Sequence, residues 1–173
     1  YNQLIIIITK KESKSIWNLI PQGKKIKELI KNYSKGSSPA ITSRLKNTKQ
    51  TSLHIGLLDS KLEAFDRLAF SRDMIKSVTQ EKAGSLAIWV LGFETDFQKK
   101  FTEEILSAAL VGQFILPSFK SKSPTQKITS ISLIGLDKKM ITKDIVAESD
   151  GNNLTRWLTA LPSNKLDADS YIN

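Results

Sequence analysis

The sequence predicts an α/β domain with three layers, α/β/α, built on a mixed, largely parallel sheet. Short apolar runs with the period of a strand alternate along the chain with longer stretches in which apolar residues recur every three or four positions. This alternation favours parallel strands that are joined by crossover helices covering both faces of a sheet. The length of 173 residues suits one domain, and 40% hydrophobic residues can fill its core.

A buried strand is predicted at the start of the chain, over residues 4–9. This run contains Leu4 and the isoleucines at positions 5 to 8, followed at once by lysines. It is too short for a signal-peptide core of about 7–15 apolar residues or a transmembrane helix of about 20. A strand inside the sheet is therefore the better interpretation.

Residues 23–33 have the pattern of an amphipathic helix with a basic outer face. Its apolar stripe consists of Ile26, Leu29, Ile30 and Tyr33, and its basic stripe consists of Lys24, Lys27, Lys31 and Lys35. Residues 1–50 carry a net charge of +9 (11 basic minus 2 acidic residues), which is the net charge of the whole chain. Such a face can attract nucleic acid or an anionic membrane surface. We favour a solvated helix, because no aromatic or arginine cluster accompanies the lysines.

Two further strands are predicted over residues 40–45 and 53–57, the second with one apolar and one polar face that includes His54. Residues 61–82 fit two structures. Ser60 and Glu63 have the spacing of a capping box, which would start a helix, whereas the apolar residues at 65 to 70 fit a short strand before a helical turn.

Residues 85–91 form a nearly continuous apolar run between two glycines, which predicts a central strand covered on both faces. A helix is predicted over residues 96–114, because Thr95 and Gln98 have the spacing of a capping box. One face of this helix narrows from large to small side chains, which would let its C-terminal end approach the sheet closely. These residues are Phe97, Phe101, Ile105, Ala108 and Gly112.

The last two predicted elements are a well-buried strand over residues 128–134 and a helix over residues 142–161. Pro162 ends the helix, because proline has no N–H and crowds the preceding turn. The helix carries one apolar stripe, made of Leu154, Trp157, Leu158 and Leu161. Trp157 fits either the core or a contact with another domain.

Residues 153–164, Asn-Leu-Thr-Arg-Trp-Leu-Thr-Ala-Leu-Pro-Ser-Asn, resemble the interdomain junction of the leucyl aminopeptidase family (family M17, cytosol aminopeptidase). In that family a helix of the type Asn-Leu-Ala-Arg-x-Leu leads into a Pro-x-Asn turn. The matching positions here are Asn153, Leu154, Arg156, Leu158, Pro162 and Asn164. Residues 108–120 resemble the helix end upstream of that junction, at Gly112, Phe114, Phe119 and Lys120. The two motifs together cover the C-terminal third of the chain.

The resemblance implies a division of the chain. Residues 1–141 would be the N-terminal, non-catalytic domain, which resembles a macro domain, and residues 142–161 the connecting helix. Residues 162–173 would begin a catalytic domain that the chain does not contain. The parent would be a cytoplasmic, hexameric metalloprotease that removes N-terminal amino acids from peptides, with two divalent metals (Zn or Mn) in its catalytic domain. The complete absence of cysteine fits a reducing compartment.

The expected role of the chain is therefore structural: covering the catalytic domain, shaping assembly or limiting access to the active site. The family's metal-binding motif, of the type Asn-Thr-Asp-Ala-Glu-Gly-Arg, does not occur in the sequence. We assign no catalytic and no metal-binding residue and expect the chain alone to be inactive. The apolar stripe of the last helix is the candidate interdomain contact.

Few other residues suggest chemistry. His54 is the single histidine, which excludes a histidine-rich metal site and favours a structural or surface role. Gly92 and Gly135 follow strands, where an α/β crevice lies, but isolated glycines are typical of ordinary turns, and no glycine-rich phosphate loop occurs. The acidic pairs are predicted to be solvated; they are Glu103 with Glu104, Asp167 with Asp169, and Glu148 with Asp150. The alternative functions are a basic nucleic-acid-binding module and a macro-like ligand-binding module.

Overall fold

The computed structural model describes residues 1–10, 15–32, 40–81, 84–118, 127–136 and 142–162. Five strands and five helices lie in these residues; the short helix at residues 16–19 was not predicted, and the others lie close to positions that the apolar periodicity predicts. They are β1 (Gln3–Thr9), α1 (Ile16–Leu19), α2 (Gly23–Asn32), β2 (Ala40–Arg44), β3 (Ser52–Leu58), α3 (Ala64–Thr79), β4 (Gly84–Leu91), α4 (Thr95–Gln113), β5 (Ile128–Ile134) and α5 (Lys143–Ala160).

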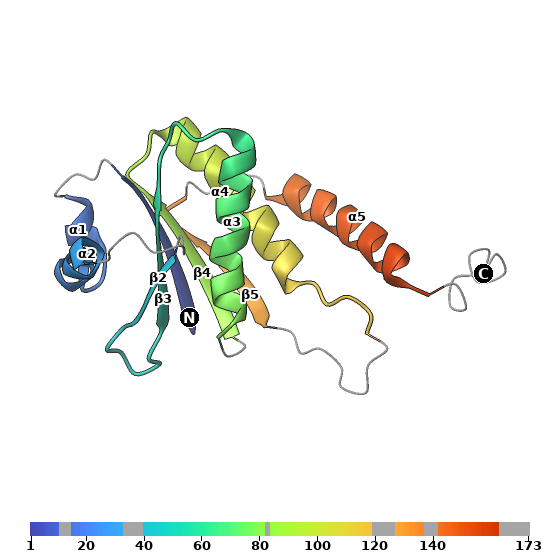
Figure 1. Cartoon of the computed structure of the whole chain (residues 1–173), viewed down its shortest axis with the longest axis horizontal. Helices are drawn as coiled ribbons and strands as arrows, with labels where there is room; N and C mark the ends of the chain where they lie inside the picture. Colours follow the sequence, from blue (N-terminus) through green and yellow to red (C-terminus); the bar gives the residue numbers. More distant parts are fainter. Residues whose placement is uncertain (11–14, 33–39, 82–83, 119–126, 137–141, 163–173) are drawn as a thin grey trace.

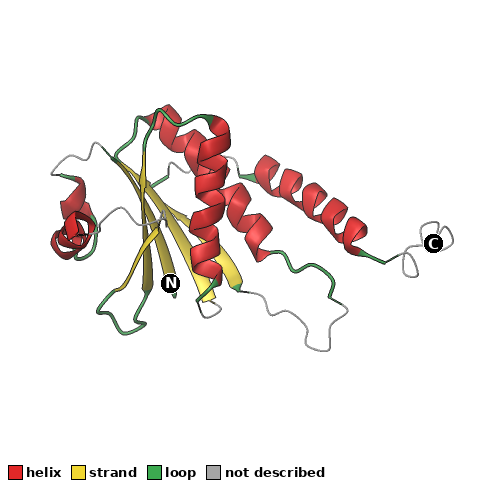
Figure 2. Cartoon of the chain, viewed as in Figure 1, coloured by secondary structure: helices red, strands yellow, loops and turns green. Residues whose placement is uncertain are grey.

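One mixed, largely parallel sheet forms the middle layer, as predicted. Its strand order is β2-β3-β1-β4-β5, and only β2 runs antiparallel to its neighbour. Helices α1 and α2 cover one face, whereas α3 and α4 cover the other (Figure 1). Figure 2 shows that α5 continues beyond the sheet, away from α1 and α2. The α/β/α fold class is therefore confirmed.

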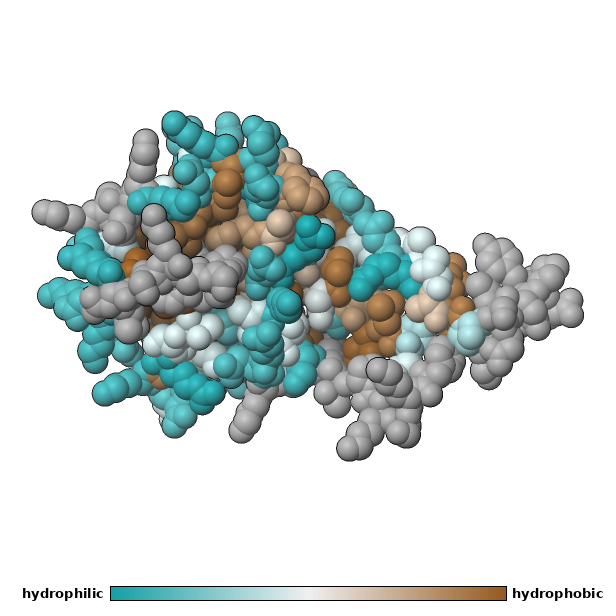
Figure 3. Space-filling view, in the orientation of Figure 1, coloured by the Kyte–Doolittle hydropathy of each residue, from teal (hydrophilic) through white to brown (hydrophobic). Residues whose placement is uncertain are grey.

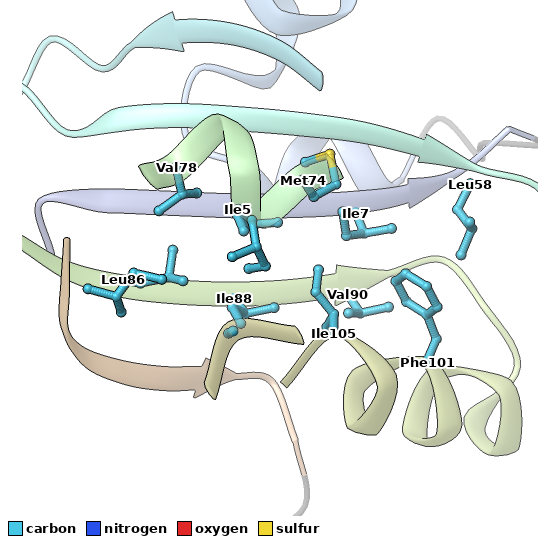
Figure 4. Close-up of a cluster of buried hydrophobic side chains, with 13 residues drawn as sticks. Ile5, Ile7, Leu58, Met74, Val78, Leu86, Ile88, Val90, Phe101 and Ile105 are labelled. Atoms are coloured by element: carbon cyan, nitrogen blue, oxygen red, sulfur yellow. The ribbon is translucent and has the colours of Figure 1, made fainter. Parts of the chain in front are cut away.

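The central strand β1 separates two apolar cores. Ile5 and Ile7 point to the side of α3 and α4, and Ile6 and Ile8 point to the side of α1 and α2. All four are fully buried, because successive side chains of a strand face opposite sides and both sides of this strand are covered. Figure 4 shows the first core, in which β1 and β4 meet Met74 of α3 and Phe101 of α4.

Residues 61–82 contain a single helix, α3, so the strand interpretation of residues 65–70 is wrong. Phe65 is 74% exposed, whereas the side chains that enter the core, Met74, Ile75 and Val78, have helical spacing. Glu63, rather than Ser60, is the N-cap residue, and its side chain makes no capping hydrogen bond. The apolar residues at 65 to 70 therefore did not mark a buried strand.

The capping box predicted at Thr95 is also wrong. The helix α4 is preceded by Glu94, which has extended backbone angles and makes no side-chain capping hydrogen bond. The Gln98 side chain instead donates to the Val90 carbonyl at 2.9 Å. Thr95 and Gln98 have the spacing of a capping box, but Thr95 already lies inside the helix. The Gln98 side chain instead joins α4 to β4.

The narrow end of α4 approaches α3 more closely than it approaches the sheet. A Cβ atom at Gly112 would lie 2.6 Å from Ile75 Cγ2 of α3 but 3.8 Å from Ile128 Cδ1 of β5. The glycine is therefore needed for the contact between the two helices, and our expectation that it serves the sheet requires this correction.

The two faces of β3 and the burial of β5 differ from the predictions. The polar face of β3 is buried too, with His54 fully enclosed under α3, so this strand is not half-buried. The strand β5 was expected to be well buried, but only Ile128 is; Thr129 and Ser130 are exposed. It pairs with β4 alone among the described strands, so it lies at the edge of the sheet where fewer side chains cover it.

Candidate interdomain contact surface

The helix α5 presents a polar face to the rest of the domain. Its fully buried side chains are Ser149 and Asn153, with 2% and 5% exposure. Val146, Leu154 and Trp157 are 38%, 57% and 40% exposed. Because successive residues of a helix turn by about 100°, these three share a face beside the buried polar one. This is the reverse of an ordinary surface helix, which turns its apolar stripe toward the core.

Polar contacts run along the buried face of α5. The Asn153 carboxamide oxygen accepts a hydrogen bond from Arg156 Nη1 at 2.8 Å, and its nitrogen donates to Ser149 Oγ at 3.5 Å. A cavity of about 380 Å³ lies between these residues and the end of α4, where Phe114 and Ile115 line it. The described polar contacts of this face lie within α5, and the space between α5 and the end of α4 is not completely filled by side chains.

The exposed apolar residues of α5 are joined by two from the segment after α4. Ile115 and Leu116 are 40% and 37% exposed, and Ile115 lines the same cavity as Ser149 and Asn153. Figure 3 shows brown, apolar side chains at the α5 end of the molecule. We use the name α5 apolar surface for Val146, Leu154, Trp157, Leu158 and Leu161.

Of the stripe predicted as an interdomain contact, Leu154 and Trp157 are exposed, and Leu158 and Leu161 are partly exposed. Trp157 therefore does not belong to the core of the described residues, which removes one of its two interpretations. Its role as a contact for another domain stays a prediction. Val146 extends the stripe toward the start of the helix, and the sequence pattern alone did not include it.

The predicted basic surface lies on α2, where Lys24 and Lys31 are exposed. Lys27 is partly buried, with its Nζ atom 5.7 Å from the centre of the Trp17 ring, so it packs against α1. Lys35 lies outside the described residues. Lys25 is exposed on the same helix, and the prediction did not include it because its position does not have the three- or four-residue spacing of the predicted basic stripe.

The surroundings of His54 are those of a buried residue with a structural role. Its Nδ1 atom lies 2.9 Å from Ser77 Oγ, and that hydroxyl donates to the Met74 carbonyl at 2.7 Å. Since the hydroxyl has a single proton, His54 Nδ1–H is the donor to Ser77, and Ser77 is not activated as a nucleophile. Nε2 of His54 is buried without a hydrogen-bond partner among the described residues. Burial lowers the pKa of His54, and the nearby Glu81 opposes this shift only in part.

One acidic residue that was predicted to be solvated is buried in an ion pair. Glu104 of α4 accepts from Arg67 of α3 at 2.6 Å to Nη2 and 2.9 Å to Nε, and both side chains are largely buried. The prediction failed because the partner lies 37 residues away in the sequence. Glu148 and Asp150 are exposed, as expected, and Asp167 and Asp169 lie outside the described residues.

The two glycines after strands have the turn role that was predicted for them. Gly92 and Gly135 have φ angles of 79° and 75°, a conformation that favours glycine. A Cβ atom at Gly92 would also lie 2.4 Å from Ile16, and one at Gly135 would lie 2.9 Å from the Trp89 ring nitrogen.

Among the described residues, no group of three or more His, Asp or Glu side chains is arranged so that it could hold a metal ion. No helix in the described part is long and apolar enough to cross a membrane.

Two solved structures share the fold over nearly the whole chain. A mutant of tomato leucine aminopeptidase matches with a TM-score of 0.69 and 15% sequence identity, over 95% of this chain and 36% of that one. The bottromycin maturation enzyme BotP matches with a TM-score of 0.61 and 11% identity, over 98% of this chain and 35% of that one. No family model and no curated protein matches the sequence. The chain spans about a third of each enzyme, and the fold predicted from the resemblance, that of the N-terminal domain of the leucyl aminopeptidases, is confirmed.

Proposed function

We propose that this chain is the non-catalytic N-terminal domain of a metal-dependent leucyl aminopeptidase that removes N-terminal amino acids from peptides. The observation that carries the proposal is the match of 95% of this chain to only 36% of tomato leucine aminopeptidase. A domain of that size leaves room in a parent protein for a separate catalytic domain. The two sequence motifs in residues 108–120 and 153–164 support the same family.

The α5 apolar surface is the proposed contact with the catalytic domain. Residues 142–161 form the connecting helix in this proposal, and the structure describes α5 from Lys143 to Ala160. Leu154 and Trp157 would lose their exposure to water when the second domain covers them, which stabilises the contact by about 1.5–3 kcal/mol for a fully buried leucine-sized side chain. Tryptophan at the centre of such a contact is a frequent anchor.

Catalysis would belong to the other domain. The two divalent metals, Zn or Mn, would be bound there, since the described residues of this chain lack a set of ligands for them. Cytoplasmic location and a hexameric parent are implied by the resemblance and stay predictions. The role of this domain would be to cover the catalytic domain, shape assembly or limit access to the active site.

Peptidase assays on two lengths of the protein test this proposal. The 173-residue chain should not hydrolyse leucine amide with added Mn²⁺ or Zn²⁺, whereas a protein extended through the catalytic domain should. Hydrolysis by the 173-residue chain alone would contradict the proposal.

Paired variants test the contact itself. Replacing Leu154 and Trp157 with serine should lower the free energy of unfolding of the extended protein by at least about 2 kcal/mol more than that of the 173-residue chain. Asn152→Ala, on an exposed side of the same helix, is the matched control and should change both proteins alike. Equal effects of the serine variants in both proteins would show that nothing docks on this surface.

A second candidate function, nucleic-acid binding, is favoured by the exposure of Lys24, Lys25 and Lys31 on α2. Binding through these lysines would weaken steeply with salt, because each neutralised phosphate releases counterions. Lys24→Gln with Lys31→Gln should then weaken binding to duplex DNA at low salt. The control, Lys99→Gln with Lys100→Gln on α4, removes the same charge from other exposed positions. A titration without binding at low salt would reject this candidate.

A further inference from the structure

A cavity of about 370 Å³ lies at the carboxyl edge of the sheet, far from the α5 apolar surface in sequence. It is lined by Thr9 at the end of β1, Ser60 after β3, and the segment that leads from β4 into α4. This edge is where α3 and α4 begin, at the top of Figure 1. The chain crosses from one side of β1 to the other between β3 and β4, so the cavity is at a topological switch point, where α/β proteins commonly bind ligands.

Two phenylalanines form the apolar part of the cavity. Phe93 and Phe97 have ring centroids 5.0 Å apart with an interplanar angle of 31°, and both are partly buried against the first core. Phe97 also stacks on the fully buried Phe101 at 6.2 Å, so the aromatic wall is held by the core behind it. A wall that is already packed on one side is preformed for a ligand on the other.

Among the described residues that line the cavity, the charged group is the carboxylate of Glu94. It makes no capping hydrogen bond to α4, and no described residue forms an ion pair with it. Thr9 and Ser60 contribute hydroxyl groups. The aromatic faces and the carboxylate are both complementary to a positive charge.

An anion is less suited to the same place. The first N–H groups of α4 carry a partial positive charge, but Glu94 and Asp96 both stand at that end of the helix and oppose it. No lysine or arginine is among the described lining residues. Arg67, whose guanidinium is 5.8 Å from the centre of the Phe97 ring, is neutralised by Glu104.

We propose that this cavity binds a small primary amine with an apolar tail. The ammonium group would lie against Glu94, and the tail would lie on Phe93 and Phe97, with Thr9 and Ser60 at the rim. This proposal is independent of the proposed function, because it concerns only residues of the 173-residue chain and requires no catalytic domain. It also differs from phosphate binding, for which the described lining residues offer no basic side chain.

Backbone NMR titrations of the 173-residue chain test the proposal with three probes: isoamylamine, its neutral analogue isoamyl alcohol, and AMP. The amine should shift the amide signals of Thr9, Ser60, Gly92 and Glu94 and should bind up to about fivefold more tightly than the alcohol, because only the amine forms an ion pair with the exposed Glu94 carboxylate. Glu94→Gln should reduce the affinity for the amine to that for the alcohol. Glu148→Gln removes the same charge from an exposed position on α5 and should leave the affinity unchanged.

Three results would overturn the proposal. They are equal binding of amine and alcohol, shifts by the amine at signals other than those of the cavity, and tighter binding of AMP than of the amine. Loss of binding in Glu94→Gln counts in favour only when its spectrum otherwise matches that of the unchanged protein, which shows that the domain is still folded. If Glu94→Gln does not fold, Phe97→Leu is used as the test variant in its place. Phe97→Leu should bind the amine more weakly than the unchanged protein does, and an unchanged affinity for the amine would contradict the proposal.

Discussion

The centre of the sheet and α5 bury opposite kinds of side chain. In β1 the isoleucines at positions 5 to 8 are all fully buried, half of them on each face of the sheet. In α5 the fully buried side chains are the polar Ser149 and Asn153, whereas Leu154 and Trp157 are exposed. The difference shows that the apolar side chains at the centre of the sheet are covered on both faces, whereas the described residues leave the apolar side chains of α5 exposed. Substitutions in the centre of the sheet should therefore destabilise the 173-residue chain itself. Substitutions on the α5 apolar surface should instead destabilise mainly a protein extended through the catalytic domain.

The largest loss of stability is expected from a substitution on the side of α4 that packs against the sheet. Phe101→Ala removes a fully buried ring from among β1, β4 and α3, and should lower the free energy of unfolding by about 3–5 kcal/mol. Urea denaturation followed by circular dichroism measures this change. A loss below about 1 kcal/mol would mean that the helix layer is not packed as described.

A somewhat smaller effect is expected from the ion pair that joins α3 to α4. Arg67→Met leaves the Glu104 carboxylate largely buried without its partner and should cost about 3 kcal/mol. The double variant Arg67→Met with Glu104→Leu should recover much of that loss, because it removes the unpaired charge. A double-mutant cycle measures the coupling, and additive losses would contradict a buried pair.

The buried histidine of β3 should make the core sensitive to acid. The pKa of His54 is lowered in the folded protein, so below the ordinary value of 6.5 the unfolded chain takes up the proton first. The free energy of unfolding should consequently fall as the pH drops below 6.5, by at most about 1.4 kcal/mol per pH unit from this residue. Denaturation curves at pH 7.5 and below 6.5 (proposed conditions) check this, and His54→Gln should flatten that part of the dependence.

The smallest effect is expected at the α5 apolar surface in the isolated chain. Leu154→Ala and Trp157→Ala should each change the free energy of unfolding by less than about 0.5 kcal/mol, because these side chains are exposed. The same measurement used for Phe101→Ala applies. Losses of several kcal/mol would show that α5 belongs to the core, and the contrast between the two regions would disappear.

Local patterns were sufficient to place most elements. The apolar run of residues 85–91 and the helical spacing of residues 96–114 correspond to β4 and α4, because these periods follow from backbone geometry alone. They were insufficient at residues 61–82, where Phe65 belongs to an exposed turn of α3. They also overestimated the burial of β5, since a position at the edge of a sheet depends on strand order.

The candidate surfaces divide in the same way. The stripe on the last helix and the lysines of α2 were found from spacing, and their exposure required the structure. The cavity beside Glu94 was not predicted as a binding site, although Gly92 marked its loop. Its residues come from three separate parts of the chain, and no local motif joins Thr9, Ser60 and Phe97.

By itself, the sequence determined the α/β class, the position of most helices and strands, the two motifs that resemble the leucyl aminopeptidases, and the concentration of positive charge in residues 1–50. These properties depend on neighbours within a turn or two of the backbone. Only the tertiary structure decided that Glu104 meets Arg67, that His54 is enclosed, and that α5 turns its polar side inward. Each of these is a contact between residues far apart in the chain, and such contacts follow from how the layers pack.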